Sequence, residues 1–467
     1  MRRNLALTFF LAVVFIAGVA LPAQQANQTR TQPGAARPIR YVIILSVDGL
    51  MPATYMQPDR CGLRVPTLRT MVRNGAWSSG ARSVLPSLTY PAHTSIATGV
   101  NPARHGIVSN EAFDPLDKND DGWHWYAEDI RVPTLWDLAR QQGLRTALVW
   151  WPVTVGAKGT AVVPEIWRAG TAEDRKLVRA LSTPGVLEAV QKRFPDFEKG
   201  FDPPRTRDTT VADIAVHLIE TVRPNLLMLH IFDVDHEEHQ KGPFSAEACE
   251  AIEGADAQIA RLIEAAKKAG TWQQTALVVV SDHGFAMAPQ QVRPGILLRE
   301  KGLITLDEKN KITDWKAAVH SLSGSAYVYV KDPNDSQTKA VLLETLRPLA
   351  GKEGSGIARV LTAEDIQKMG GDPQAFLWLE AAPGFRVANG YRGDYASQAS
   401  TVATHGFDPA RADMQAALLI YSPALAAGEI GPARLIDVAP TVARWLGLKM
   451  EKVEGTPLPV KYRIFAR

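Results

Sequence analysis

The sequence predicts an α/β protein with a mostly parallel central sheet and helices on both faces. Strand-like and helix-like segments alternate along most of the chain, as parallel strands joined by helical crossovers require. Residues 40–47 form a continuous β-rich run, which is typical of a central strand that is buried on both faces. We expect strands at 40–47, 146–150, 225–232, 275–280 and 416–421, and helices at 65–74, 133–142, 209–222, 246–269 and 434–446.

Prolines and glycines mark the ends of the predicted helices. Pro66 lies early in the first helix, and Gly75 follows its last residue. Gly143 closes the second helix in the same way. These residues support the helix boundaries independently of the apolar pattern.

Residues 286–400 are less regular than the rest of the chain. They contain a short strand signal at 325–330 and a helical signal at 337–349. We expect this segment to be an insertion that caps part of one face of the α/β domain.

The composition is that of a globular chain with a large core. The chain has 467 residues, 46% of them hydrophobic, and a formal net charge of +3. This mild charge, without basic runs, gives no reason to expect a nucleic-acid polymer or an anionic membrane surface as a partner.

The N-terminus is typical of a signal peptide. Two arginines precede an apolar run at 5–21, which Gly18 interrupts. The run is short for a membrane span, so we expect cleavage and no stable span afterwards, and a periplasmic or secreted protein. The twin arginine leaves the export route open. The expected segments are a signal peptide at 1–23, a flexible tether at 24–39 and a folded domain at 40–467.

Cys61 and Cys249 are the only cysteines. An exported protein could join them, but the sequence does not show that they lie close together. Two unpaired thiols agree with the sequence equally well.

Acidic residues follow three of the predicted strands. Asp48 follows the first strand, Asp233 and Asp235 follow the third, and Asp282 follows the fourth. Acids at strand ends often cap helices, so one alone would mean little. Because the carboxyl ends of parallel strands meet at one edge of a sheet, three such acids predict a shared site.

Histidines accompany these acids at metal-ligand spacing. His239 lies four residues after Asp235, which places both on one side of a helical turn, and His283 directly follows Asp282. Clustered buried carboxylates are costly without cations, and mixed oxygen and nitrogen donors suit zinc or a similar divalent ion. The expected ligands are Asp48, Asp235, His239, Asp282, His283 and His405, with the oxygen of Thr89.

Thr89 lies just ahead of Pro91, a proline that suits the first turn of a helix. A helix N-terminus stabilises anions and lowers the cost of forming an alkoxide there. A plain helix start explains the pattern equally well, but a pair of metal ions would suit in-line displacement at phosphorus by this hydroxyl.

Together these motifs resemble the nucleotide pyrophosphatase/phosphodiesterase family of the alkaline phosphatase superfamily. The matching segments occur in family order over residues 41–447, and the ordered set is far more specific than any one segment. They are 46–49, 86–93, 98–110, 235–243, 282–284 and 404–406.

The resemblance implies an alkaline phosphatase-like fold and an exported two-zinc phosphodiesterase or nucleotide pyrophosphatase. Thr89 would be the nucleophile and form a phospho-threonine intermediate, and the side-chain amide of Asn110 would donate to a phosphate oxygen. The substrate would be a small phosphorylated molecule, a nucleotide or another diester. One zinc would be held by Asp235, His239 and His405, and the other by Asp48, Asp282, His283 and Thr89.

Two other functions stay open. A phosphomonoesterase could use the same metal ions, although no arginine directly follows Thr89, which favours diesters or pyrophosphates. A non-catalytic, metal-stabilised binding protein could keep the fold, but the intact Thr89 and the complete ligand set argue against it.

The sequence departs from the family pattern outside the ligand set. His230 stands where nucleotide-cleaving members tend to carry a tyrosine that stacks on the base, Leu88 where many have lysine, and Ala92 where the family has asparagine. Hydrolysis is therefore expected, whereas a preference for nucleotides is left open.

Three weaker signals complete the sequence analysis. Residues 117–128, from Asp117 to Glu128, fit the calcium loop of an EF-hand, but Pro115 interrupts the helix that should precede it, so a solvated acidic turn is the alternative to Ca²⁺. Asp233, Glu237 and Glu238 could hydrogen-bond to the histidines. The third signal is an aromatic group, which belongs either to the core or to a wall over the leaving group: Trp123, Trp125, Tyr126, Trp150 and Trp151.

Overall fold

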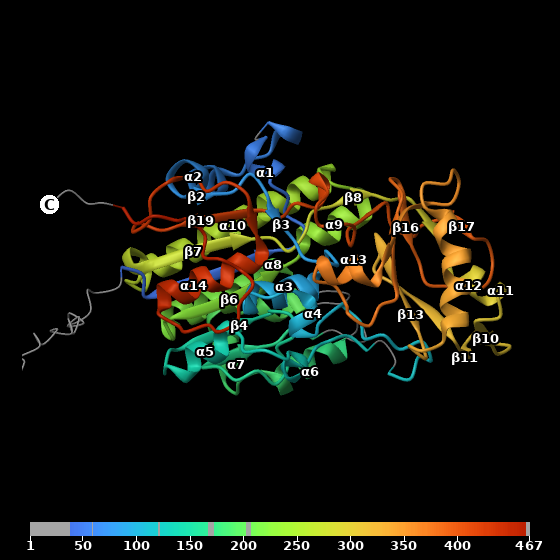
Figure 1. Ribbon diagram of the computed structural model, residues 1–467. Helices are drawn as coiled ribbons and strands as arrows, with labels where there is room; N and C mark the ends of the chain where they lie inside the picture. The colour runs from blue at the N-terminus through green and yellow to red at the C-terminus, as the bar shows by residue number, and fades with distance from the viewer. Residues whose placement is uncertain (1–37, 58, 120–121, 167–171, 202–206, 464–467) are drawn as a thin grey trace, which may run out of the picture. The chain divides into compact units, whose positions relative to one another are not determined.

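The predicted parallel sheet lies at the centre of the computed structural model (Figure 1). Within the described residues this sheet has eight strands, in the order β20-β2-β19-β7-β1-β6-β4-β5. All neighbours from β7 to β5 are parallel, whereas β19 runs antiparallel to β7 and β2. The strands are Gly428–Glu429 (β20), Ala76–Trp77 (β2), Leu418–Tyr421 (β19), Thr275–Val280 (β7), Tyr41–Val47 (β1), Leu226–Ile231 (β6), Thr146–Val149 (β4) and Ala161–Val163 (β5).

The structure describes most of the chain after the predicted N-terminal segments. Ile39 is buried in the core, so packing begins just before the boundary expected at residue 40. The predicted signal peptide and nearly all of the tether lie outside the described residues. The described residues are 38–463 without 58, 120–121, 167–171 and 202–206.

The register of the three central strands brings their ends to one edge. Ser46 on β1 pairs with His230 on β6 and with Val280 on β7. Asp48 and Asp282 each follow this row by two residues, so their backbones leave the sheet together. The alternation of strands and helices therefore predicted the edge at which the acids meet.

Helices cover both faces of the sheet, and successive residues of β1 point to opposite sides. Ile43 and Leu45 pack in one core cluster with residues of α2, α8 and α10. Val42 and Ile44 pack in a second cluster with residues of α3, α5 and α14. These helices are Pro66–Asn74 (α2), Asp208–Thr221 (α8), Ala246–Lys268 (α10), Thr89–Thr98 (α3), Leu135–Gln141 (α5) and Val438–Leu446 (α14).

The residues expected to form an insertion contain a sheet of their own. Four strands pair antiparallel in the order β12-β13-β15-β14, and α12 accompanies them in the orange region of Figure 1. The strand expected at 325–330 and the helical segment at 337–349 are confirmed. The elements are Ala317–Ser321 (β12), Ser325–Val330 (β13), Leu377–Ala381 (β15), Ile357–Thr362 (β14), Ser336–Leu346 (α12) and the 3₁₀ turn Arg347–Leu349 (η5).

Cys61 and Cys249 form a disulfide, so the alternative of two unpaired thiols is wrong. The bond joins the 3₁₀ turn Arg60–Gly62 (η1) to the first turns of α10. It links positions 188 residues apart, a distance over which the sequence gives no pairing signal.

The remaining α-helices of the described residues lie in the connections around the sheet. None of the helices in the described ranges is both long and apolar enough to span a membrane. These helices are Ala53–Met56 (α1), Pro102–His105 (α4), Ala172–Leu181 (α6), Val186–Arg193 (α7), Asp233–Lys241 (α9), Gly295–Glu300 (α11) and Ala363–Lys368 (α13).

Candidate metal centre

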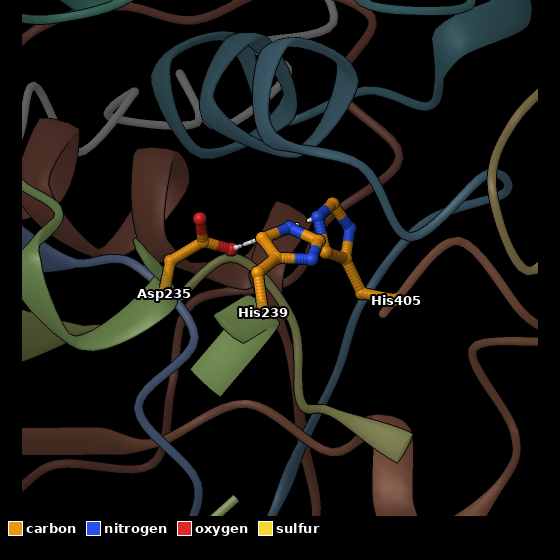
Figure 2. Close-up of side chains that lie close together, drawn as sticks. All are labelled: Asp235, His239 and His405. Carbon is orange, nitrogen blue, oxygen red and sulfur yellow. Dashed lines mark ion pairs between the residues drawn. The ribbon is translucent and has the colours of Figure 1, made fainter. Parts of the chain in front are cut away.

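One cluster of metal-ligand type forms where α9 follows β6. Asp235 and His239 lie one turn apart on α9, with 3.5 Å between Asp235 Oδ1 and His239 Nε2. His405, which follows β18 (Ala403–Thr404), places Nε2 3.6 Å from the same oxygen. Figure 2 shows the carboxylate and the two imidazoles facing one another. The three donors lie within 4.8 Å of one another, close enough to share one ion.

A second cluster lies at the ends of β1 and β7. His283 Nε2 is 3.2 Å from Asp48 Oδ1 and 3.2 Å from Asp282 Oδ2, and all three side chains are buried. The rings of His283 and His405 stack with centroids 3.6 Å apart, so the two clusters are adjacent. The structure thus divides the six expected side-chain ligands into the two sets that the resemblance implies.

Several ligand atoms are buried without a hydrogen-bond partner among the described residues. Such atoms are costly in a protein interior unless another group satisfies them. A divalent ion bound by oxygen and nitrogen donors would satisfy them, so the residues present fit the implied metal ions. The atoms are Asp48 Oδ1, Asp235 Oδ1, Asp282 Oδ2 and His283 Nε2.

The three histidines of the two clusters share one hydrogen-bond pattern. Each donates a hydrogen bond from Nδ1 to a backbone carbonyl, which leaves the lone pair of Nε2 to face the cluster. This is the tautomer that an imidazole needs to bind a metal ion through Nε2. The acceptors are Ala403 for His239 (3.0 Å), Ser87 for His405 (3.1 Å) and Gly284 for His283 (3.2 Å).

The electrostatics of the two clusters favour an added cation. Burial raises the pKa of Asp48 well above its ordinary value, and the carboxylates of Asp282 and Asp235 raise it further. Burial also raises the pKa of Asp235 and lowers the pKa values of His283 and His405, with neighbouring imidazoles adding to both decreases. Positive charge at the centre would stabilise the ionised carboxylates that burial disfavours.

Thr89 and Asn110 open onto the same cavity as the ligands. Thr89 is the first residue of α3, which confirms the expected helix start. Asn110 Oδ1 accepts a hydrogen bond from the Tyr90 backbone N–H at 2.9 Å, so the amide nitrogen is the end left to donate. The cavity has a volume of about 290 Å³, and Asp48, Asp235, His239 and His405 are among its lining residues.

His230 lines this cavity, and both of its ring nitrogens are engaged in hydrogen bonds. Its side chain is buried at 2% exposure, with Nε2 3.0 Å from Asp48 Oδ2 and Nδ1 2.9 Å from Glu165 Oε2. Burial lowers the pKa of His230, but the hydrogen bonds to Asp48 and Glu165 outweigh it and hold the pKa well above its usual value. The residue is thus part of the ligand surroundings.

Glu165 is a site residue that the sequence analysis missed. Its Oε1 accepts a hydrogen bond from the Tyr90 hydroxyl at 3.0 Å, while Oε2 bonds to His230. Glu165 is an acid just after a strand, as Asp48 and Asp282 are. The signal was present, but β5 has only three residues and was not recognised as a strand.

The predicted aromatic group divides between the wall and the core. Trp123 and Trp150 line the cavity together with Tyr90 and Phe232, and the rings of Tyr90 and Trp123 meet edge to face at 5.1 Å. The other members serve elsewhere: Trp125 and Trp151 are buried in the core clusters, and Tyr126 is exposed.

The acidic residues near the histidines and the predicted calcium loop have different outcomes in the structure. Glu238 is buried, but its oxygens make no hydrogen bond to the histidines within the described chain, so its expected partnership with them is wrong. Asp233 accepts a hydrogen bond from the Asp208 backbone. The calcium loop partly lies outside the described residues and stays a prediction. No α-helix flanks its described part between α4 and α5, and Asp117 pairs with Lys311 at 3.2 Å.

Comparison with known proteins finds relatives over most of the chain. The sequence model of the type I phosphodiesterase / nucleotide pyrophosphatase family matches residues 42–408. Human ectonucleotide pyrophosphatase/phosphodiesterase family member 1 is 24% identical over 272 residues, which are 56% of this chain and 25% of the human protein. A venom phosphodiesterase of Crotalus durissus collilineatus is 25% identical over 253 residues, 52% of this chain and 26% of the venom protein. This chain therefore spans about a quarter of the length of these curated relatives.

Solved structures show the same fold. Human ectonucleotide pyrophosphatase / phosphodiesterase 5 superposes with a TM-score of 0.62 at 18% identity, covering 89% of this chain and 97% of the human chain. An inactive variant of the murine protein, in complex with AMP, gives a TM-score of 0.61 at 19% identity with the same coverage. The mixed α/β fold with a large, mostly parallel sheet is thus common to these chains.

Proposed function

Because the chain belongs to the type I phosphodiesterase / nucleotide pyrophosphatase family, we propose that it is an exported, two-zinc hydrolase of phosphate diesters or pyrophosphates. One observation carries the proposal. Two adjacent clusters of ligand-type side chains contain buried donor atoms without a hydrogen-bond partner among the described residues. Asp48 of one cluster, and Asp235, His239 and His405 of the other, line one cavity together with a threonine at a helix N-terminus.

Two zinc ions would occupy the two clusters. Asp235, His239 and His405 would hold one ion, and Asp48, Asp282, His283 and Thr89 would hold the other. When bound, the ions would supply Lewis acidity at the phosphate and lower the pKa of the Thr89 hydroxyl.

Thr89 acts as the nucleophile in this proposal. A bond forms between its Oγ and phosphorus while the bond from phosphorus to the leaving oxygen breaks, and the hydroxyl proton passes to the departing alcohol or to solvent. Water then attacks the phospho-Thr89 intermediate, which restores the hydroxyl and releases the product. The N-terminus of α3 and the Asn110 amide stabilise the charge that develops on the phosphate oxygens.

The cavity supports a small substrate with one phosphate near the threonine. Its described lining contains no lysine or arginine, which supports a singly charged diester over the dianion of a monoester. Trp123, which is half-buried and packs edge to face against Tyr90, offers an aromatic surface for an apolar or planar substituent. A nucleotide is consistent with the AMP bound to the murine structure, and His230, at the position of the family's stacking tyrosine, is instead hydrogen-bonded to Asp48 and Glu165.

Export is supported by two features. The predicted signal peptide precedes the folded domain, and disulfides such as Cys61–Cys249 persist in oxidising compartments. Cell fractionation tests this part of the proposal, which requires the mature protein outside the cytoplasm.

Substitution of the nucleophile tests the reaction. Zinc-loaded wild-type protein should cleave an aryl phosphodiester with higher kcat/KM than an aryl monoester, with a nucleoside triphosphate as the third substrate. Thr89→Ala should lower kcat more than about 10³-fold, whereas Thr89→Ser keeps a hydroxyl and should retain measurable turnover. Full activity of Thr89→Ala would refute the assignment of Thr89 as the nucleophile. If the zinc-loaded wild type cleaved none of these substrates, the result would favour the alternative function of a non-catalytic, metal-stabilised binding protein.

A further inference from the structure

The two oxygens of the Asp48 carboxylate have different surroundings. Oδ2 accepts the hydrogen bond from His230 Nε2 at 3.0 Å. Oδ1 lies 3.2 Å from His283 Nε2 and is buried without a hydrogen-bond partner among the described residues. One oxygen therefore bonds to the protein, and the other is left for an ion.

His230 is held from both sides. It pairs in register with Ser46 on the neighbouring strand, two residues before Asp48, so the backbone places its ring beside the carboxylate. Glu165 Oε2 accepts from the opposite ring nitrogen at 2.9 Å. A flip of the imidazole would put ring carbons in place of both nitrogens and break both bonds, so the two acceptors fix the orientation of the ring.

Glu165 extends this connection to the nucleophile segment. Its second oxygen accepts from the hydroxyl of Tyr90, the residue that follows Thr89 in the first turn of α3. The side chains of Tyr90, Glu165 and His230 are all buried. A continuous hydrogen-bonded path thus runs from α3 to the ligand carboxylate.

We propose that Glu165 and His230 are positioning residues that hold Asp48 with Oδ1 directed to its metal ion. Hydrogen bonding of Oδ2 prevents rotation of the carboxylate and favours binding through one oxygen, as partners of metal ligands generally do. The inference rests on the proposed function, because it assumes that an ion occupies this cluster. It assigns His230 a role other than contact with a substrate base.

Zinc binding, measured by competition with a chelator of known affinity, tests the inference without a substrate. His230→Ala and Glu165→Ala should each lower the affinity for one of the two zinc ions on the order of 10- to 100-fold. The affinity for the other ion should stay within about twofold of the wild-type value. Glu165→Gln is the conservative variant. Its amide oxygen can still accept from Tyr90 and its amide nitrogen can donate to Nδ1 of neutral His230, so it should restore most of the affinity. His217→Gln, at a histidine of α8 that belongs to neither cluster, is the control.

Three outcomes would overturn the proposal. Unchanged affinity for both ions in the two alanine variants would show that Asp48 needs no such support. If both zinc affinities fell equally and the metal-free variants unfolded at a lower temperature than metal-free wild type, the role of the two residues would be merely structural. A Glu165→Gln variant as weak as Glu165→Ala would refute the hydrogen-bonded path. If the wild type binds two zinc ions but cleaves no ester, the proposed function fails, and the positioning role is still judged on affinity.

Discussion

At the scale of single residues, one backbone hydrogen bond determines what Asn110 can do. The Tyr90 N–H occupies the amide oxygen, so only the amide nitrogen remains to face the cavity that Asn110 lines. A neutral donor at this place can stabilise charge on a phosphate oxygen without competing with the carboxylates for the ions.

Replacement of Asn110 should therefore affect turnover far more than metal binding. Asn110→Ala should lower kcat for an aryl diester about 10²- to 10³-fold, because it removes one donor from the developing charge. Asn110→Asp keeps the acceptor for the Tyr90 N–H but has no donor, so it should lose a similar amount. Zinc content, measured by mass spectrometry, should stay at the wild-type value in both. A kcat within tenfold of wild type in both variants would contradict the assigned role.

The sequence predicted the members of the two clusters better than it predicted their hydrogen-bond partners. Asp48, Asp235 and Asp282 were found because each follows a strand, and a strand end is visible in the apolar pattern. The bonds of His230 to Asp48 and Glu165 join residues 182 and 65 positions apart. No spacing along one element reports such side-chain contacts between elements, so they required the three-dimensional structure.

At the scale of elements, the N-termini of α8 and α9 stabilise each other. Asp208 Oδ1 accepts from the backbone N–H groups of Phe232 and Asp233, and Asp233 Oδ2 accepts from the N–H of Asp208. Such carboxylates satisfy amides that a helix start leaves unpaired. Burial, followed by the nearby Asp233, raises the pKa of Asp208 to about 7.

This shift makes stability depend on pH in a defined direction. The pKa of Asp208 is higher in the folded than in the unfolded protein, so the unfolded chain releases its proton first as pH rises. The contribution of Asp208 to the free energy of unfolding is therefore present below about pH 4 and is lost between about pH 4 and 7.

Asp208→Asn should remove this loss of stability at higher pH. The amide keeps an oxygen for the two N–H groups but cannot ionise, so the variant should be more stable than wild type at pH 8, by about 1 kcal/mol or more, and nearly equal to it at pH 4. Urea unfolding of metal-free protein at several pH values measures the difference. Glu264→Gln, at an exposed position of α10, should show no such pH-dependent gain. An Asp208→Asn variant less stable than wild type at pH 8 would mean that the charge is needed for capping.

Long elements were predictable and short ones were not. The central strands were expected within two residues of their observed ends, because their buried apolar runs are longer than chance produces. β5, β2 and β20 have two or three residues each. Such strands exist because a neighbouring strand offers hydrogen bonds, which is a property of the sheet and not of their own sequence.

At the scale of the whole molecule, the fold gathers charges that would repel one another in the absence of an ion. The candidate ligands come from positions 48 to 405 and meet in a largely buried centre, where the carboxylates of Asp282 and Asp235 already raise the pKa of Asp48. Packing the sheet therefore carries an electrostatic cost that bound cations would offset. Stability and metal binding should accordingly be linked.

Removal of metal tests this linkage. Treatment with a chelator should abolish hydrolysis and lower the thermal midpoint of unfolding, and added zinc should restore both. Zinc bound at one site adds about 2.7 kcal/mol to the free energy of unfolding when the free zinc concentration is a hundred times the Kd of that site. Mg²⁺, which prefers six oxygen ligands, should restore far less. Thr89→Ala keeps all six carboxylate and imidazole side chains of the two clusters, so zinc should still raise its thermal midpoint while kcat stays more than about 10³-fold below wild type. This separates the stabilising effect of the ions from their part in the reaction, and a chelated wild type that unfolds at the zinc-loaded midpoint would refute the linkage.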